Sequence, residues 1–254
     1  MEKIAQKLKC LEDIFKNLGG LAIALSGGLD SSVLLFLAAN FLGRKKVLAY
    51  TITSPIINPE DLYHARLVAS HLGIKHEFIA FDHLSLKAFQ QNPKNRCYFC
   101  KKEMFKALIT KSPYPVADGT QLDDLNDYRP GLKAISELKI LSPLKEAGFP
   151  KEEIRLLAKK FRLPNYKREA SPCLATRFLT GEPITRDSLL MIQKAENYLK
   201  GLGLSLVRVR KKANLAIIEV TLSEQEKVLG NQRSIVSFFK KLGFKKILYN
   251  LEGY

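Results

Sequence analysis

The sequence of 254 residues lacks any segment that would carry it into a membrane. No stretch approaches the roughly 18 uninterrupted apolar residues of a membrane-spanning helix, and residues 1–20 form a charged amphipathic pattern rather than a signal peptide. Cysteine is also scarce, with 4 residues, and a chain of this kind is not expected to rely on structural disulfides. We therefore expect a cytoplasmic protein that has no membrane partner.

Acidic residues are few compared with basic ones. The 25 Asp and Glu residues against 41 Lys and Arg residues leave a formal net charge of +16, which suits phosphorylated ligands or a polyanion. A lysine-rich solvated surface explains the same excess, and the lysines are spread along the chain without interleaved aromatic residues. Charge alone therefore does not establish nucleic-acid binding, and we do not expect nucleic acid as the partner.

The sequence Ser-Gly-Gly-Leu-Asp-Ser-Ser at residues 26–32 lies between an apolar strand pattern, residues 21–25, and an apolar helical pattern, residues 33–39. A glycine-rich turn between a strand and a helix directs backbone N–H groups and the helix N-terminus at an anion. Gly27 and Gly28 allow a phosphate to come close. The alternative is a tight turn that uses glycine and serine for geometry alone.

Four polar side chains in this turn suit a metal-bound polyphosphate. Ser26, Ser31 and Ser32 add hydroxyl donors. A carboxylate beside phosphates needs a cation to share, so we predict that Mg²⁺ bridges Asp30 and a pyrophosphate, which makes Asp30 a catalytic candidate. The motif lacks the Gly-Lys-Ser/Thr of the common NTPases and the Gly-x-Gly-x-x-Gly of dinucleotide turns. It resembles the PP-loop of ATP pyrophosphatases, which adenylate a substrate carbonyl oxygen with ATP and release pyrophosphate.

Strand patterns at residues 46–53, 75–80 and 114–117 follow, and helical patterns separate them. Pro59, followed by two acidic residues, predicts the start of one such helix, and Gly73 predicts its end. Alternating strands and helices predict an α/β fold with a doubly wound parallel sheet, HUP-like as the PP-loop resemblance implies. Ligands of such sheets bind at the carboxyl ends of the strands. Four residues assigned to an ATP cleft fall at such ends: Asp30, Thr53, Gly119 and Thr120.

The pattern changes in the later part of the chain. An irregular stretch at residues 163–181 leads into a helical pattern at residues 189–202. Strand patterns at residues 204–210 and 215–221, a helical pattern at about residues 234–242 and a strand pattern at residues 246–251 follow, which is an α+β order. We therefore predict two domains, a PP-loop ATP-binding domain at residues 1–165 and a smaller α+β domain at residues 166–254.

Three cysteines lie at positions that suggest a chemical role. Cys97 and Cys100 form a Cys-x-x-Cys at a helix start, and Cys173 lies in the irregular stretch. Three thiolates suit a [4Fe–4S] cluster that leaves one iron open. A structural zinc site, which normally wants four ligands, a redox dithiol, and free thiols with Cys173 as nucleophile or sulfur donor remain alternatives. Cys10 lies in the amphipathic first helix and is expected to serve packing.

Several segments together resemble one family of PP-loop enzymes, the LarE sulfurtransferases, over nearly the whole chain. The matching segments are residues 26–32, 95–101, 117–120, 123–131, 142–144, 171–177, 207–210 and 250–254. LarE proteins act in nickel-pincer nucleotide synthesis. The resemblance implies that the protein adenylates a carboxylate of pyridinium-3,5-biscarboxylic acid mononucleotide with ATP and converts it to a thiocarboxylate.

The resemblance also implies roles for particular residues. It implies that Cys97, Cys100 and Cys173 hold a [4Fe–4S] cluster whose bound sulfide is delivered, while in other members the cysteine at the position of Cys173 is itself consumed. It adds Asp123 to the cofactor-binding residues. Five residues are assigned to the substrate nucleotide: Arg177, Arg208, Arg210, Glu196 and Glu219. A homo-oligomer is implied as well, and a hexamer is compatible with it.

Other functions fit part of the pattern. A tRNA thiolation enzyme also combines a PP-loop with three cysteines and an iron–sulfur cluster, but we recognise no added RNA-binding module. An amide-forming PP-loop synthetase does not need three matched cysteines. A nucleotide-binding regulatory protein would release no pyrophosphate. Arg208 and Arg210 point to the same side of a strand, which favours an anion site but also fits a solvated strand face.

Overall fold

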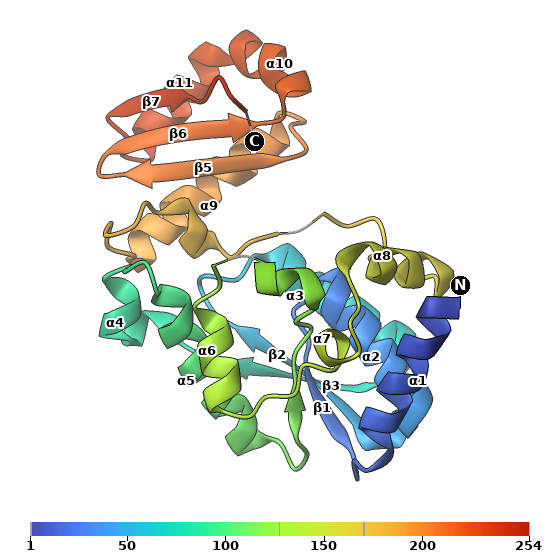
Figure 1. The fold of residues 1–254 in the computed structure, drawn as a ribbon. Helices are drawn as coiled ribbons and strands as arrows, with labels where there is room; N and C mark the ends of the chain where they lie inside the picture. Colours follow the sequence, from blue (N-terminus) through green and yellow to red (C-terminus); the bar gives the residue numbers. More distant parts are fainter. Residues whose placement is uncertain (1, 127, 170, 254) are drawn as a thin grey trace. The chain divides into compact units, whose positions relative to one another are not determined.

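The computed structural model describes residues 2–126, 128–169 and 171–253 (Figure 1). The chain divides into two compact units: the first unit is Met1–Asp82 with Asn95–Ser171, and the second unit is His83–Lys94 with Pro172–Tyr254. Asp127 and Tyr254, which fall in segments of the family resemblance, lie outside the described residues.

The first unit is built on a parallel sheet in the strand order β3-β2-β1-β4. Its strands are β1 (Leu21–Ala24), β2 (Val47–Thr53), β3 (Lys75–Ala80) and β4 (Val116–Ala117). Its helices are α1 (Glu2–Lys16), α2 (Leu29–Leu42), α3 (Pro59–Leu72), α5 (Arg96–Lys111), α6 (Gly131–Glu137), α7 (Pro143–Glu146) and α8 (Lys151–Lys160), with 3₁₀ turns η1 (Arg44–Lys46) and η3 (Leu122–Asn126). The strand order reverses at β1, because β2 and β4 flank it on opposite sides, and this is where doubly wound sheets bind ligands.

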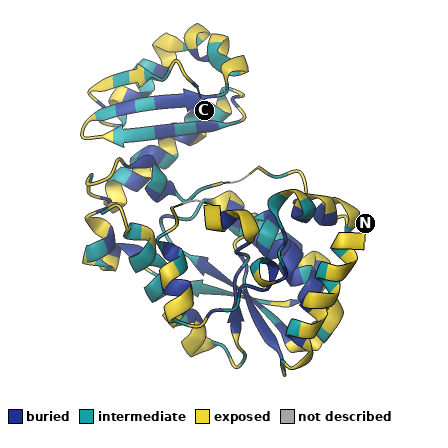
Figure 2. Ribbon diagram, in the orientation of Figure 1, coloured by how far each residue is buried: buried dark blue, intermediate teal, exposed yellow. Residues whose placement is uncertain are grey.

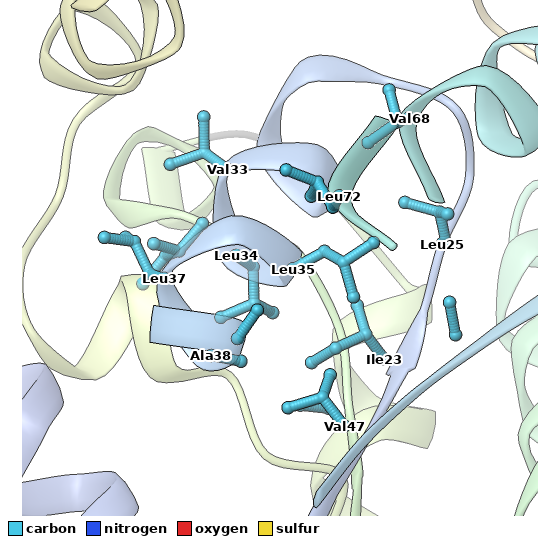
Figure 3. Close-up of a cluster of buried hydrophobic side chains, with 14 of the residues drawn as sticks. Ile23, Leu25, Val33, Leu34, Leu35, Leu37, Ala38, Val47, Val68 and Leu72 are labelled. Atoms are coloured by element: carbon cyan, nitrogen blue, oxygen red, sulfur yellow. The ribbon is translucent and has the colours of Figure 1, made fainter. Parts of the chain in front are cut away.

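Helices cover both faces of this sheet, which confirms the predicted doubly wound α/β class. Alternate residues of a strand point to opposite faces, so Ile23 and Val47 pack with α2 and α3 (Figure 3). Ala22 and Tyr50 point to the other face and pack with residues of α5 and α6. Figure 2 shows β1 and β2 as largely buried between these layers, whereas the edge strand β3 has intermediate exposure.

The second unit is a small α+β structure, as predicted. Its sheet has the order β5-β6-β7, with β5 and β6 antiparallel and β6 and β7 parallel. Its elements are η2 (His83–Ser85), α4 (Lys87–Gln90), η4 (Leu174–Arg177), α9 (Arg186–Gly201), β5 (Val207–Lys212), β6 (Leu215–Val220), η5 (Leu222–Glu224), α10 (Gln225–Gly230), α11 (Gln232–Lys241) and β7 (Lys246–Tyr249). The helices α9 and α11 contribute to one apolar core with the sheet.

The segment His83–Lys94 belongs to the second unit although it lies in the middle of the sequence of the first. Asn92 accepts a hydrogen bond from the Gly181 N–H and donates from its amide to the Leu179 carbonyl. The Gln90 carbonyl accepts from the Ile184 N–H. These bonds tie the segment to the chain that precedes α9.

Two predicted strands have different limits in the structure. The strand expected at residues 114–117 is only Val116–Ala117, because the preceding Pro115 has no N–H to donate. The strand expected from Leu204 begins at Val207. Leu204 instead belongs to the turn after α9, which ends at Gly201: its N–H donates to the Leu199 carbonyl, and the preceding Gly203 has φ +81°.

None of the helices formed by the described residues is long and apolar enough to span a membrane.

Candidate functional site

The predicted phosphate-binding turn lies between β1 and α2 in the first unit. Gly27 has φ +78°, and a Cβ atom there would lie 2.1 Å from the Asp61 carbonyl oxygen of α3. Only glycine tolerates this combination of conformation and contact. Gly28 has φ −79° and a more open environment, so its missing side chain leaves space at the start of α2.

The serine hydroxyls of the turn bond to one another and to the backbone. The Ser31 hydroxyl lies 3.0 Å from the Ser26 hydroxyl and accepts from the Ser26 N–H at 3.2 Å. The Ser32 hydroxyl donates to the Gly28 carbonyl at 2.8 Å. Ser31 and Ser32 are buried and Ser26 is exposed. The two buried hydroxyls thus support the shape of the turn, and Ser26 can meet a ligand.

Asp30, in the first turn of α2, forms an ion pair with Lys151 at the start of α8. The Lys151 Nζ lies 2.6 Å and 2.8 Å from the two carboxylate oxygens. Burial raises the pKa of Asp30, while the Lys151 ammonium opposes this rise. The carboxylate is therefore held in a position where a cation is favourable, which fits its predicted role as a Mg²⁺ ligand.

Gly119 and Thr120 follow β4, next to the turn. A Cβ atom on Gly119 would lie 2.7 Å from the Ser31 backbone nitrogen, so the absence of a side chain lets the end of β4 approach the start of α2. The Thr120 hydroxyl and N–H both donate to Asp118, whose carboxylate also accepts from the Ser142 hydroxyl at 2.9 Å. This buried network fixes the chain at the carboxyl end of β4.

The other two predicted cofactor-binding residues of the first unit have local structural contacts. The Asp123 carboxylate accepts from the Lys151 N–H at 2.9 Å and so binds a backbone donor at the start of α8. Thr53 ends β2, and its hydroxyl points to the Ile79 carbonyl at 3.5 Å.

Sequence reasoning missed Asn165 and Arg168, which hold the turn from outside. The Asn165 amide donates to the Gly27 carbonyl at 3.0 Å and to the Ser32 hydroxyl at 2.9 Å. Arg168 donates to the same carbonyl at 3.1 Å and also to the Asp61 carboxylate. Both lie more than a hundred residues from the turn in sequence, and no local pattern identifies them.

The cysteines are distributed over both units. Cys97 and Cys100 lie in the first turn and a half of α5, three residues apart, which places them on one face of the helix. Cys97 is exposed and Cys100 is half-buried. Cys173 precedes η4 in the second unit. None of the four cysteines, all of which are described, is in a disulfide.

The chain around Cys173 is held by its own neighbours. The Cys173 carbonyl accepts from the Thr176 N–H at 3.0 Å and from the Thr176 hydroxyl at 2.8 Å. Arg177 donates to the Pro172 carbonyl at 3.0 Å and to the Thr176 hydroxyl at 3.0 Å. These contacts fix the backbone on both sides of the thiol.

Arg177 is buried and paired with Glu196 of α9 through two donors, at 2.7 Å and 3.2 Å. Glu196 also accepts from the Val209 N–H of β5 at 3.0 Å. The pair thus connects the Cys173 segment, α9 and β5. Arg177 and Glu196, both predicted to serve the substrate, are therefore buried and bonded to each other.

Arg208 and Arg210 share one face of β5. Arg210 donates to Glu219 of β6 at 2.7 Å and to the Thr176 carbonyl at 3.0 Å. Burial and the neighbouring guanidinium groups of Arg177 and Arg210 lower the pKa of Arg208. The second unit therefore brings all five predicted substrate residues together, with three guanidinium groups near two carboxylates. The excess positive charge suits a phosphate or a carboxylate.

The donor sets fit the predicted cofactors to different degrees. Asp30 with the glycine turn provides a hard oxygen ligand and backbone donors for a Mg²⁺–polyphosphate. Cys97 and Cys100 provide two thiolates within reach of one iron centre. Across the described parts of the chain, no three His, Cys, Asp or Glu side chains are grouped so that they could hold a metal ion. The cluster stays a prediction.

Comparisons with known proteins support the resemblance of the first unit to PP-loop enzymes. The family model of asparagine synthase matches residues 19–90, which include the turn. An NH₃-dependent NAD⁺ synthetase of Methanocaldococcus jannaschii is 33% identical over 181 residues, 61% of this chain and 69% of the relative. The fold and the turn therefore define an ATP-using enzyme of the PP-loop class.

Other relatives match over nearly the full length of both chains. The pyridinium-3,5-bisthiocarboxylic acid mononucleotide synthase of Lactiplantibacillus plantarum is 33% identical over 258 residues, 100% of this chain and 94% of the relative. An uncharacterized protein of Synechocystis is 38% identical over 260 residues, 99% of this chain and 96% of the relative. The chain belongs to the LarE family of sulfurtransferases.

Proposed function

We propose that this protein adenylates a carboxylate of pyridinium-3,5-biscarboxylic acid mononucleotide with ATP and converts it to a thiocarboxylate. The observation that supports this most is the group of three arginines in the second unit, two of which donate to the backbone beside Cys173. This group would place an anion-binding site beside the sulfur atom of Cys173. A full-length relative is named as the bisthiocarboxylic acid mononucleotide synthase, which supports the same function.

The chemistry needs two steps. A carboxylate oxygen of the substrate attacks the α-phosphorus of ATP and pyrophosphate leaves. A sulfur nucleophile then attacks the acyl carbon, and the C–O bond to AMP breaks. Adenylation is required because oxide is a poor leaving group whereas AMP is a good one, and the protein contributes by positioning both reactants.

Residues of the first unit would handle ATP. The backbone donors at Gly28 and at the start of α2 would bind the phosphates, and Asp30 would ligate Mg²⁺. When bound, Mg²⁺ would neutralise charge that develops on the departing pyrophosphate. Asn165 and Arg168 keep the Gly27 peptide in place through its carbonyl.

Residues of the second unit would handle the substrate nucleotide. Arg208 and Arg210 would bind its phosphate or its second carboxylate, and the Arg177–Glu196 pair would keep Cys173 in position. We further propose that Cys97, Cys100 and Cys173 ligate one [4Fe–4S] cluster, which would supply a sulfide on the iron that lacks a protein ligand.

The decisive experiment is an anaerobic assay of purified protein with ATP, Mg²⁺ and the biscarboxylic acid mononucleotide. We expect pyrophosphate release that depends on the mononucleotide, together with a product heavier by the exchange of oxygen for sulfur in mass spectrometry. Pyrophosphate release that requires tRNA instead would support the tRNA thiolation alternative. Absence of pyrophosphate release with either substrate would overturn the proposal.

A metal and sulfide count separates the two routes of sulfur delivery. About four irons and at least four sulfides per chain, with a visible absorption band, would support the cluster. No iron, and a loss of H₂S from Cys173 after turnover, would support consumption of that cysteine.

We also propose that the protein is a cytoplasmic homo-oligomer. Light scattering on the purified protein would measure its mass against the 28.7 kDa of one chain.

A further inference from the structure

The Lys151 ammonium occupies the place next to Asp30 where the proposed function requires Mg²⁺. Its Nζ lies 2.6 Å from Oδ1 and 2.8 Å from Oδ2 of Asp30. Both oxygens of the carboxylate therefore face one cation. A carboxylate that is already paired with an ammonium group has a lower affinity for a divalent cation.

Lys151 is fixed at its backbone while its side chain can move. It is the first residue of α8, and its N–H is held by the Asp123 carboxylate at 2.9 Å. The ammonium sits at the end of a flexible four-carbon stem. It can therefore leave Asp30 by rotation of side-chain bonds, without a shift of the helix.

The ion pair between Lys151 and Asp30 is only partly buried, so both groups can exchange partners. The side chains of Lys151 and Asp30 keep 29% and 28% of their exposure. A partly exposed ion pair holds its two partners weakly. A Mg²⁺–triphosphate offers both groups partners of higher charge, namely the divalent ion for Asp30 and the polyphosphate for Lys151. Asp30 would exchange an ammonium for a divalent ion, and Lys151 would exchange a carboxylate for a polyphosphate.

We infer that Lys151 is a placeholder cation: without nucleotide it occupies Asp30 and excludes Mg²⁺, and when Mg²⁺–ATP arrives it moves to the phosphates. This inference rests on the proposed role of Asp30 as metal ligand. It implies that metal and nucleotide bind together, and that Mg²⁺ alone does not bind the empty turn.

The test measures metal binding rather than turnover. Mn²⁺ replaces Mg²⁺ in an electron paramagnetic resonance titration, with and without α,β-methylene-ATP, which cannot be cleaved to pyrophosphate. In wild type we expect tight Mn²⁺ binding only with the nucleotide. In Lys151→Met we expect Mn²⁺ alone to bind at least about tenfold more tightly than in wild type, and Mn²⁺–nucleotide at least about tenfold more weakly, as loss of one charge-assisted contact predicts.

Lys7→Met is the matched control. Lys7 forms a 2.6 Å ion pair with Glu153 in the same helix as Lys151, with similar exposure, but away from the turn. We expect this variant to bind Mn²⁺ as wild type does, in both conditions. Thermal unfolding of each variant without ligands shows whether it is folded, and Lys151→Gln replaces Lys151→Met if the latter is not.

Each outcome has one meaning. Equal affinity of wild type and the uncharged variant for Mn²⁺ alone overturns the placeholder role, even where the nucleotide complex forms normally. If wild type does not bind Mn²⁺ even with the nucleotide, the failure lies in Asp30 as metal ligand and therefore in the proposed function.

Discussion

Charged side chains of the candidate sites already have partners within their own unit. Asp30 is paired with Lys151, Arg177 with Glu196, and Arg210 with Glu219. A ligand that reaches these residues must exchange partners or bind the net charge that remains. The Asp30–Lys151 pair is partly exposed and contributes little to stability. The Arg177–Glu196 pair is buried, and its disruption would leave a buried charge.

Asp30→Ala should abolish Mg²⁺-dependent pyrophosphate release, because the triphosphate loses the carboxylate that anchors its metal ion. The measurement is pyrophosphate formed per chain at saturating ATP. Asp13→Ala, an exposed change in α1, should leave the rate unchanged. Activity close to wild type in the Asp30 variant would contradict its assignment as metal ligand.

Arg208→Ala should weaken binding of the substrate nucleotide by about 1.5–3 kcal/mol, the loss expected for one hydrogen bond to a charged group. Arg210→Ala should lose a similar amount. Titration calorimetry with the mononucleotide and with ATP measures both, and ATP affinity should barely change. Lys212→Ala, at the exposed end of β5, is the control. Equal losses for both ligands would assign the arginines to the fold.

The predicted phosphate-binding turn is held from three directions. The end of β4 approaches it through Gly119, α3 contacts Gly27, and Asn165 with Arg168 binds the Gly27 carbonyl. Such support keeps the backbone donors oriented before a ligand arrives, which reduces the entropy lost on binding.

Gly27→Ala and Gly28→Ala should differ strongly in stability. The alanine Cβ at position 27 would lie 2.1 Å from the Asp61 carbonyl oxygen and force an unfavourable positive φ, so we expect a loss of about 3 kcal/mol or more. At position 28 the nearest atom is the Ser26 hydroxyl at 3.2 Å, and we expect a loss below about 1 kcal/mol. Urea unfolding measures both, and equal losses would contradict the close contact between the turn and α3.

A hydrogen-bond chain links β3 and β2 to Leu25, which follows β1 and precedes the turn. His76 Nε2 lies 2.8 Å from the Thr51 hydroxyl, which donates to the Leu25 carbonyl at 2.6 Å. Because that hydroxyl donates to Leu25, it accepts from His76, so the imidazole carries a proton on Nε2. The chain connects the sheet to the residue that precedes Ser26.

The His76 chain predicts a loss of stability in acid. Burial, assisted by Arg66, lowers the pKa of His76 from its ordinary value of 6.5. The unfolded state therefore binds more protons below about pH 6.5, so stability falls as the pH drops from 6.5 towards the lowered pKa of the folded state. His76→Leu should flatten this part of the curve of unfolding free energy against pH. His71→Leu, on an exposed position of α3, should not, and an unchanged slope in the His76 variant would contradict the prediction.

The whole molecule separates its candidate functions between two units. The turn, Asp30 and the Cys97–Cys100 pair belong to the first unit, and Cys173 with the arginine group belongs to the second. Each unit has its own apolar core. Substitutions in one candidate site are therefore expected to leave the fold of the other unit intact.

Cys97, Cys100 and Cys173 are predicted to act together. Replacing Cys97, Cys100 or Cys173 by Ala should abolish the iron–sulfur absorption and sulfur transfer, while pyrophosphate release remains largely intact because adenylation does not use the thiols. Cys10→Ala, outside the matched motifs, should do neither. A cluster that survives in Cys173→Ala would instead favour consumption of Cys173 as the sulfur donor.

The sequence by itself determined those features that depend on near neighbours. Apolar periodicity and the glycine turn predicted β1, the turn and α2, and the start of α3 at Pro59 and its end before Gly73 were also predictable. Alternation along β5 predicted that Arg208 and Arg210 share a face. The full-length motif resemblance predicted the LarE family, which the relatives confirmed.

Only the tertiary structure decided which distant groups meet. Lys151 contacts Asp30 across 121 residues, and Arg168 contacts Gly27 across 141. Nothing in the composition of the segment His83–Lys94 indicates that it belongs to the second unit. Local sequence patterns indicate the period of a helix or a strand. These contacts instead arise when elements pack around a shared core, and no local pattern distinguishes the lysine or arginine that makes such a contact from the others in the chain.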